Sequence, residues 1–501
     1  MLFRPDERDF RLIGFYAGKV LFGVGLVMLL PAALAIVLGE GNDAVSFVIG
    51  ACLAVLVGQA SQTFLRSPAP LSTSHGLTAV ALSYFVVPFF ACIPLLLSGH
   101  YASYLDAYFE SVSAFATTSL TLVNDLDHLS RSVKLWRQLM QMQGGLGIVI
   151  VVLTVFAGAA GQSGLLYSGE SGDERTAPNV LPIVRFVWRL TLVYGVAGTL
   201  ALWAGMILTG LGPWEGLFHA SALFMAAFDS GGFSLHSANV AFYRSTLVEA
   251  ILMVLMVAGA FSFALHHQLW QGRSRELLRN IETRTIAASI ILIFVLVGIG
   301  LGRSMTFVDF GPLLRHGLFQ LVSAHTTTGL TTIPGRLLVT DWGVLAPAML
   351  VTAMAIGGMA GSTAGGIKAI RIGLLLKGLR RDTRKVLLPE DAVIVETYHV
   401  TTDRILRDEQ VRGAATMLLL WLVLYLTGGM LAVFYGYDVT LALFESVSAG
   451  SSTGLTVGIV RPSLEWPLKL AFIVQMVTGR LEFIAVFALA GYVVSVVRGR
   501  V

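Results

Sequence analysis

Long apolar segments recur along the whole chain, and they limit the possible folds more than any other feature. Each is about long enough to cross a hydrocarbon layer of ~30 Å as a helix, which satisfies its own backbone polar groups. The segments are Val20–Leu38, Ala44–Leu65, Leu77–Leu97, Leu139–Phe156, Phe186–Leu208, Leu247–Leu265, Ile286–Leu301, Trp342–Leu376, Met417–Phe434 and Ile473–Val497. Only 13% of the residues are charged, against about 25% in ordinary soluble domains. We therefore expect an all-α polytopic membrane protein.

Four copies of one pattern lie between these segments. In each copy a phenylalanine-containing apolar stretch runs into a short hydroxyl-rich segment, at 109–121, 218–234, 319–331 and 444–456. The interval between copies is longer than the roughly 20 to 50 residues of solenoid repeats, and it fits a helix-loop-helix membrane unit. Four equivalent loops in one membrane chain predict a single central pore.

The residue types in these loops suit a passage for dehydrated cations. A narrow pore replaces the water around a cation with backbone carbonyl oxygens, and glycine reaches the required backbone conformations without strain. The alternative is ordinary packing, because Gly, Ser and Thr are also favoured where membrane helices touch. Four copies at matched positions favour the pore. The candidate ion-binding residues of this selectivity filter are Thr117, Thr118, Ser119, Ser230, Gly231, Gly232, Thr327, Thr328, Gly329, Ser452, Thr453 and Gly454.

Basic residues gather on one side of the predicted helices. They precede the first span, follow the second, and are densest between 368 and 412. The positive-inside rule then places both termini in the cytoplasm and the four hydroxyl-rich loops outside. The first apolar segment is as long as a true span, so we expect it to remain in the mature protein. Because topology explains the basic charge, no nucleic-acid partner is expected.

A glycine-rich run and one arginine interrupt the apolar segments. Several glycines together should break the helix within 342–376 at membrane depth, where irregular backbone needs protein or a water-filled cavity beside it. Close packing of small residues is the alternative, but it does not explain the polar Ser362 and Thr363. Arg480 costs at least ~2.5 kcal/mol at the bilayer centre. It should therefore face water or a partner, either Glu482 or a carbonyl of the glycine-rich run; a purely structural ion pair is the alternative.

These motifs together resemble one family. Besides the four loops, the chain contains Trp136-Arg137-Gln138 followed by Gly144-Gly145-Leu146-Gly147, the run from Gly357 to Lys368, and Gly479-Arg480-Leu481-Glu482. They resemble the Trk/Ktr/HKT superfamily of potassium transporters, and most closely its bacterial TrkH-like pore subunit. The resemblance covers essentially the whole chain after the N-terminal segment.

The resemblance implies a fold with two extra N-terminal helices and four membrane-pore-membrane repeats around one pseudo-fourfold pore. The expected units are 1–72 for the helix pair, then 73–182, 183–283, 284–410 and 411–501 for the repeats, the third holding the gate loop and the basic cytoplasmic loop. It also implies an intramembrane gate beneath the filter, made of Gly357, Gly358, Gly361, Ser362, Thr363, Gly365, Gly366 and Arg480.

The function implied by the resemblance is potassium uptake across a bacterial cytoplasmic (inner) membrane, with K⁺ bound at the filter residues. The family forms homodimers and is gated by a cytosolic TrkA-like nucleotide-binding subunit. This chain carries no nucleotide-binding motif, so no organic cofactor is expected on it. The basic stretch 377–385 would serve as the docking surface for that subunit or face anionic membrane lipid.

Ser119 departs from the family pattern. The first loop of this branch usually carries glycine there, and in plant relatives a serine is associated with sodium permeation. A serine restricts the backbone and would narrow or re-aim one quadrant; the alternative is a tolerated replacement whose hydroxyl turns away from the pore. Laying the copies over one another matches Ser119 with Gly231, Gly329 and Gly454.

Two titratable residues accompany the loops. The carboxylate of Asp229 would concentrate cations near a pore mouth, or it would serve a helix end. His325 would tune conduction around its ordinary pKa of about 6.5, or it would pack behind the filter.

Three other functions compete with potassium uptake. A sodium-permeable or weakly selective cation transporter would share every motif. An ion-coupled secondary transporter would also show broken helices, but its repeats are usually inverted, whereas these copies run in one orientation. An enzyme is not expected, because the sequence has no metal-spaced His/Cys cluster, no Ser-His-Asp set and no phosphate-cradling motif.

Overall fold

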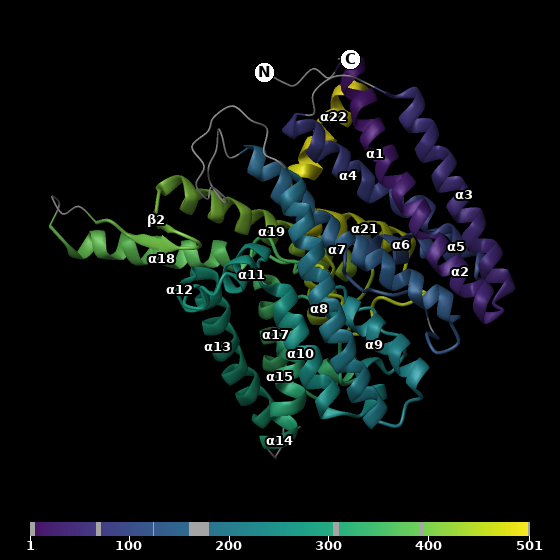
Figure 1. Cartoon of the computed structure of the whole chain (residues 1–501). Coiled ribbons are helices and arrows are strands. Elements are labelled where there is room, and N and C mark those ends of the chain that lie inside the picture. Colours follow the sequence, from purple (N-terminus) through teal and green to yellow (C-terminus); the bar gives the residue numbers. More distant parts are fainter. Residues whose placement is uncertain are drawn as a thin grey trace.

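The fold is helical over nearly its whole length (Figure 1). The structure is a computed structural model, and it describes residues 6–66, 72–123, 125–159, 180–303, 310–389 and 394–498. The first helices are α1 (Glu7–Val27), α2 (Leu29–Leu38) and α3 (Gly41–Phe64). A Cβ added at Gly58 would lie 2.8 Å from the carbonyl oxygen of Gly18. Small residues therefore let α1 and α3 pack closely, as the predicted N-terminal helix pair requires.

After this pair, a long helix leads into a short helix, a loop and another helix, four times in succession. The first set is α4 (Thr73–Ala91), α5 (Ile93–Leu97), α6 (Tyr104–Phe115) and α7 (Arg131–Ala159). The second is α8 (Val180–Leu208), α9 (Pro213–Phe228), η1 (Asn239–Tyr243), α10 (Thr246–Ala260) and α11 (Phe263–Trp270). The third is α12 (Glu276–Arg279), α13 (Ile281–Arg303), α14 (Phe310–Pro312), η2 (Leu313–Gly317), α15 (Leu318–His325), α16 (Leu337–Thr340), α17 (Leu345–Ile356) and α18 (Ala369–Leu387). The fourth is α19 (Asp408–Phe434), α20 (Val439–Gly450), α21 (Trp466–Leu481) and α22 (Ile484–Val497).

The short helices are held in a closed ring. The helix after each loop packs on the short helix of the next set: α7 on α9, α10 on α15, α17 on α20, and α21 on α6. A buried ion pair reinforces the last contact, since Lys469 Nζ of α21 lies 2.5 Å from Asp106 Oδ1 of α6. The ring places the four hydroxyl-rich loops together at its centre.

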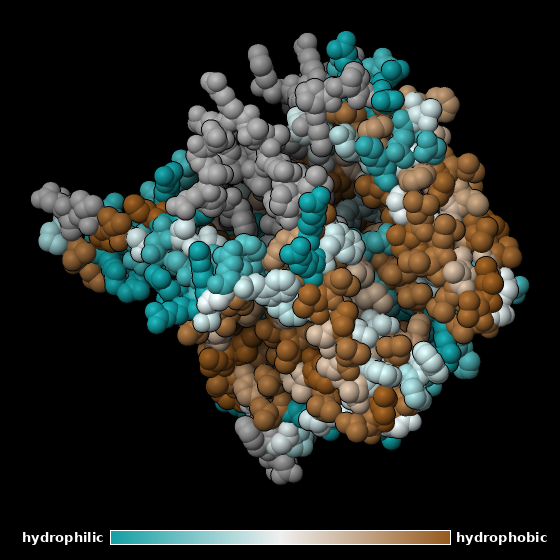
Figure 2. Space-filling model, in the orientation of Figure 1, coloured by the Kyte–Doolittle hydropathy of each residue, from teal (hydrophilic) through white to brown (hydrophobic). Residues whose placement is uncertain are grey.

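Six helical segments among the described residues are long and apolar enough to cross a membrane, so the chain is a multi-pass membrane protein. Figure 2 shows the apolar surface over the helices of the N-terminal pair and over the lower part of the molecule, where such spans face lipid. The fold confirms the predicted break within 342–376, because α17 ends at Gly357 with a φ of 72°.

Two stretches that the hydropathy pattern predicted to be continuous spans are bent instead. Leu247–Leu265 is divided between α10 and α11, which meet at 103°, and Ile473–Val497 is divided between α21 and α22, which meet at 119°. The first bend follows from Phe261 in an extended conformation and from Ser262, whose side chain caps α11. The second lies at Glu482 and Phe483, which have left-handed φ values of 58° and 64°. The hydropathy profile gives no sign of either bend.

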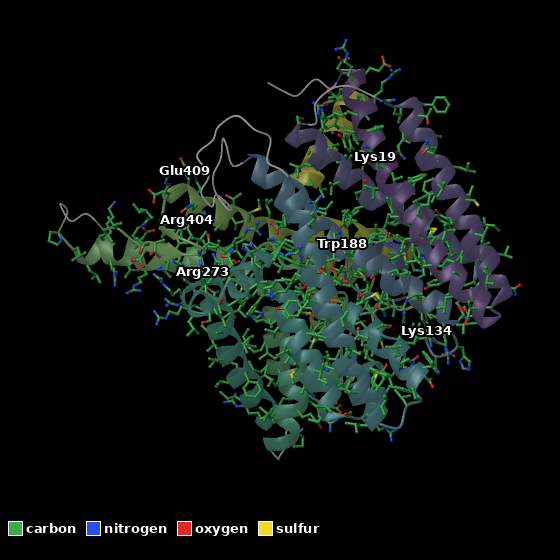
Figure 3. The ribbon with its side chains drawn as sticks, in the orientation of Figure 1. Lys19, Lys134, Trp188, Arg273, Arg404 and Glu409 are labelled. Atoms are coloured by element: carbon green, nitrogen blue, oxygen red, sulfur yellow. The ribbon has the colours of Figure 1, made fainter. Side chains whose placement is uncertain are left out.

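A basic arm extends from one side of the molecule, at the left of Figure 1. It consists of α18 and a two-stranded antiparallel hairpin, β1 (Thr397–His399) and β2 (Asp403–Ile405), in which Tyr398 faces Arg404. Figure 2 shows mainly hydrophilic residues over this arm. Arg273, Arg404 and Glu409 lie around its base, whereas Lys134 lies at the far side of the molecule (Figure 3).

Candidate functional site

The four loops share one backbone conformation. Each short helix ends with the same hydrogen bond, in which an N–H reaches back five residues to a carbonyl oxygen at 2.8 to 3.0 Å. The donor and acceptor pairs are Thr118 to Ser113, Gly231 to Ala226, Thr328 to Ser323, and Thr453 to Ser448. The residue before each donor has a positive φ of 50° to 56°: Thr117, Ser230, Thr327 and Ser452. The predicted filter segments therefore take the same turn in all four places.

The residue after each donor also has a left-handed conformation, which corrects the predicted alignment of the second loop. The φ values are 60° at Ser119, 73° at Gly232, 84° at Gly329 and 84° at Gly454. Gly232, not Gly231, therefore matches Ser119. Gly231 takes the place of Thr118, Thr328 and Thr453. The second loop contains adjacent glycines, and sequence spacing alone did not show which one adopts the left-handed conformation.

Three backbone contacts link the four loops in order, from the second through the third and fourth to the first. A Cβ added at Gly232 would lie 1.7 Å from the carbonyl oxygen of Thr328 in the third loop. One at Gly329 would lie 2.0 Å from that of Thr453 in the fourth, and one at Gly454 would lie 1.7 Å from that of Thr118 in the first. No side chain fits at these three positions, because the obstacle in each case is backbone.

Ser119 is the one residue of this layer with a side chain, and its hydroxyl points to the centre of the ring. Its Oγ lies 2.8 Å from the Cβ positions of both Gly232 and Gly329, and 2.0 Å from that of Gly454. The oxygen is buried and has no hydrogen-bond partner. This orientation disfavours the alternative in which the hydroxyl turns away from the pore.

Polar residues behind the loops hold the backbone in place, and the sequence reasoning missed them. Glu110 of α6 accepts hydrogen bonds from the Thr121 hydroxyl and the Leu122 N–H, both at 3.0 Å, and pairs with Arg137 at 2.8 Å. Glu445 of α20 likewise accepts from the Thr456 hydroxyl at 2.5 Å and from three backbone N–H groups after it. A signal was present: a polar residue follows phenylalanine in each copy, at Glu110, His219, Gln320 and Glu445.

The first two loops are also joined on the side away from the glycine-rich run. Arg137 donates to the Ser234 carbonyl at 3.2 Å, and the ring of His236 lies 2.6 Å from the Asp127 carboxylate. Burial acts to raise the pKa of Asp127, but hydrogen bonds from His236 and Ser237 hold that pKa below its usual value.

His325 lies buried behind the third loop with its Nε2 2.7 Å from the Ser289 hydroxyl. This placement supports the packing role for His325.

The glycine-rich run between α17 and α18 lies directly against three of the loops. Thr363 Oγ1 lies 3.0 Å from Ser230 Oγ and 2.8 Å from the carbonyl oxygen of Phe228. The Gly365 N–H donates to Thr327 Oγ1 at 2.6 Å. A Cβ added at Gly365 would lie 2.0 Å from the carbonyl oxygen of Ser451, before the fourth loop. The run therefore covers one end of the ring.

The remaining predicted residues of the run shape the segment itself. The Gly361 carbonyl accepts from the Phe263 N–H at 3.1 Å, across the bend between α10 and α11. Ser362 Oγ donates to the Met359 carbonyl at 2.7 Å. Gly357 and Gly366 are in backbone contact with each other, as are Gly358 and Ala260. The segment is thus a compact loop anchored on α10 and α11.

Arg480 reaches the run from α21. Its Nη1 donates to the Thr363 carbonyl at 2.6 Å and its Nη2 to the Gly145 carbonyl at 3.3 Å. Of the two partners predicted for it, the carbonyl is therefore its hydrogen-bond partner. Glu482 instead forms an ion pair with Arg371 and lies 4.0 Å from Lys368. These contacts connect the run, the first residues of α18 and the bend at the end of α21.

Comparisons with known proteins agree with this geometry. The family model of TrkH, described as a cation transport protein, matches residues 44–493. An uncharacterized cation transporter of Methanocaldococcus jannaschii is 30% identical over 97% of this chain and 96% of its own length. The Trk system potassium uptake protein TrkH of Halomonas elongata is 28% identical over 96% of this chain and 98% of its own. The crystal structure of the potassium transporter TrkH from Vibrio parahaemolyticus matches with a TM-score of 0.82 and 26% identity, covering 96% of this chain and 98% of that one.

The family model covers most of the chain, and it matches the segments that form the ring and the glycine-rich run beneath it. The chain therefore belongs to the TrkH family of cation transport proteins.

Proposed function

We propose that the chain is a channel-like pore for potassium uptake, with a selectivity filter made by the four loops. The observation that carries the proposal is the contact between successive loops, in which the left-handed glycine of the second, third and fourth loops meets a backbone carbonyl of the next loop. A ring of backbone carbonyls can replace the hydration shell of a cation. Relatives of the chain include potassium uptake proteins, which supports potassium as the ion.

In this proposal the chain consists of an N-terminal helix pair and four pore-forming units. Each of the units 73–182, 183–283, 284–410 and 411–501 contributes one filter loop, while 1–72 adds the helix pair. Both termini lie in the cytoplasm of a bacterial cell, so that ions enter from outside and pass the glycine-rich run last. The membrane potential drives them with ~2.3 kcal/mol per charge per 100 mV. The run is the gate, and Arg480 places a positive charge beside it.

Two partners complete the proposal. The chain pairs with a second copy, and a cytosolic TrkA-like nucleotide-binding subunit opens the gate. The names of the relatives refer to a Trk system, and α18 carries exposed Arg380, Arg384 and Lys385 directly after the gate. The same arm exposes apolar side chains, among them Leu379, which is 66% exposed, and Val386, which is 85% exposed. A second copy or lipid would cover them.

Flux in liposomes tests the proposed activity. Purified full-length chain should carry potassium down its gradient, and a potential that is negative inside should accelerate the uptake. The measurement is rubidium or potassium uptake with and without the cytosolic subunit, compared with sodium under the same gradient. A flux that requires stoichiometric coupling to a second solute would replace the channel with a secondary transporter. Absence of cation movement under every gating condition would overturn the proposal.

The carbonyl ring predicts a large effect of Gly454→Ala. The new Cβ would lie 1.7 Å from the Thr118 carbonyl oxygen and 2.0 Å from Ser119 Oγ, so the filter must deform. Potassium flux should fall at least about tenfold, equivalent to ~1.4 kcal/mol. Gly436→Ala is the matched control, because Gly436 has a φ of 91° and nothing within 4 Å of its Cβ position. That variant carries the same backbone strain of about 1–2 kcal/mol and should conduct normally. Equal losses in both variants would contradict the prediction.

A further inference from the structure

Two buried polar groups, a carboxyl group and a guanidinium, lie near each other beside the ring without forming a pair. Asp229, at the end of α9, is 1% exposed, and its Oδ1 has no hydrogen-bond partner. Arg480 is 5% exposed, and its Nε also lacks a partner. The two residues interact electrostatically, yet no ion pair within 4.0 Å joins them. A buried polar atom without a hydrogen-bond partner is costly, so this arrangement needs an explanation.

One glycine separates the two side chains. Arg480 Nη2 donates to the Gly145 carbonyl at 3.3 Å, and a Cβ added at Gly145 would lie 3.1 Å from the Cβ of Asp229. Gly145 thus contacts both residues, and a side chain at this position of α7 would press on Asp229.

Both groups are connected to the gate through Thr363. The Thr363 carbonyl accepts a hydrogen bond from Arg480 Nη1, while its hydroxyl lies 3.0 Å from the hydroxyl of Ser230, the residue after Asp229. When the gate loop moves away from the filter, Arg480 loses its shortest hydrogen bond. The carboxylate of Glu482 is already engaged by Arg371 and Lys368. Asp229 is the nearby acid with an unpartnered oxygen.

We propose that Asp229 is the alternative partner of Arg480 and latches the open state of the gate. With the gate closed, Arg480 is held by the Thr363 carbonyl; with the gate open, it pairs with Asp229. The pair satisfies the guanidinium and neutralises a positive charge that would otherwise repel cations beneath the filter. The inference rests on the proposed function, because it assigns an open state to the glycine-rich run.

Single-channel recording of Asp229→Asn in planar bilayers tests the latch. Asparagine has the shape of aspartate but no charge, so the open state loses its ion pair while the closed state, in which the two do not touch, is kept. The ratio of open to closed time should fall about tenfold, within the usual range of coupling between two-state elements. The unitary conductance and the reversal potential should be unchanged. Asp438→Asn is the matched control, because Asp438 caps α20 away from Arg480 and asparagine caps equally well.

A double-mutant cycle with Arg480→Gln separates the latch from other roles of the acid. If Asp229 acts through Arg480, Asp229→Asn should change nothing further once Arg480 is replaced. An equal effect in both backgrounds, or a lowered unitary conductance, would show that Asp229 acts on the permeating ion and would overturn the latch. An open-to-closed ratio equal to that of the native chain would overturn it as well. Absence of potassium current from the native chain would instead overturn the proposed function itself, and the latch with it.

Discussion

Replacing Ser119 by glycine is expected to raise the preference for potassium over sodium by about tenfold, equivalent to ~1.4 kcal/mol. The Ser119 hydroxyl occupies the centre of the ring, 2.0 to 2.8 Å from the positions where the other three loops would carry a Cβ. In the proposed pore, an oxygen there narrows the passage, which favours the smaller ion. Glycine would remove this oxygen and give the four loops the same composition at this level. Bi-ionic reversal potentials in planar bilayers measure the change.

Two comparisons make the Ser119 result specific. Ser119→Ala keeps the Cβ but removes the hydroxyl. A potassium preference between those of the native chain and Ser119→Gly would show that the Cβ and the hydroxyl each account for part of the effect. Ser119 also has a φ of 60°, and a residue with a side chain costs about 1–2 kcal/mol in that region. Ser119→Gly should therefore unfold at a higher temperature than the native chain, not a lower one. An ion preference equal to the native value in a stable Ser119→Gly protein would show that the hydroxyl has no role in selectivity.

The loops and the glycine-rich run could be located from the sequence because their signals are local. Hydroxyl-rich segments after apolar stretches and a cluster of glycines within a span require no knowledge of neighbouring chains. The position of Gly232 could not be predicted in this way. Loops three and four place a single glycine after three hydroxyl residues, whereas loop two has Gly231 and Gly232 in tandem. Only the backbone conformation distinguishes the two.

The partners of the buried charges could not be predicted because they come from distant parts of the chain. The pairing of Glu482 with Arg371 brings together the bend after α21 and a residue of α18, which are 111 positions apart. The support that Glu110 gives to the first loop depends on Arg137, which lies 27 positions later on another helix. Both bends in the apolar segments have a similar origin. At the α10–α11 bend, a backbone N–H donates a hydrogen bond to the Gly361 carbonyl of the glycine-rich run. The hydropathy profile gives no sign of this contact.

Gly365→Ala is expected to open the pore in the absence of any regulator. Its new Cβ would lie 2.0 Å from the Ser451 carbonyl oxygen and 3.1 Å from the Cβ of Ser452. The obstacle is the backbone before the fourth loop, so the glycine-rich run must shift away from the ring. That shift weakens the hydrogen bond from the Gly365 N–H to Thr327 Oγ1, because this bond needs the run to lie against the third loop. Overpacking of this kind costs typically about 1–3 kcal/mol. It destabilises only the state in which the glycine-rich run lies against the ring.

The unstimulated flux of Gly365→Ala should therefore rise roughly 5- to 100-fold over the native chain, the range that corresponds to about 1–3 kcal/mol. Rubidium uptake into liposomes without the cytosolic subunit measures it. Gly23→Ala in α1 is the matched control, since nothing lies within 4 Å of its Cβ position and the change should leave flux at the native level. The ion preference of Gly365→Ala should stay native, because the added methyl group lies below the filter layer that holds Ser119. A stable Gly365→Ala protein whose unstimulated flux stays at or below the native level would mean that the seated segment is not what closes the pore.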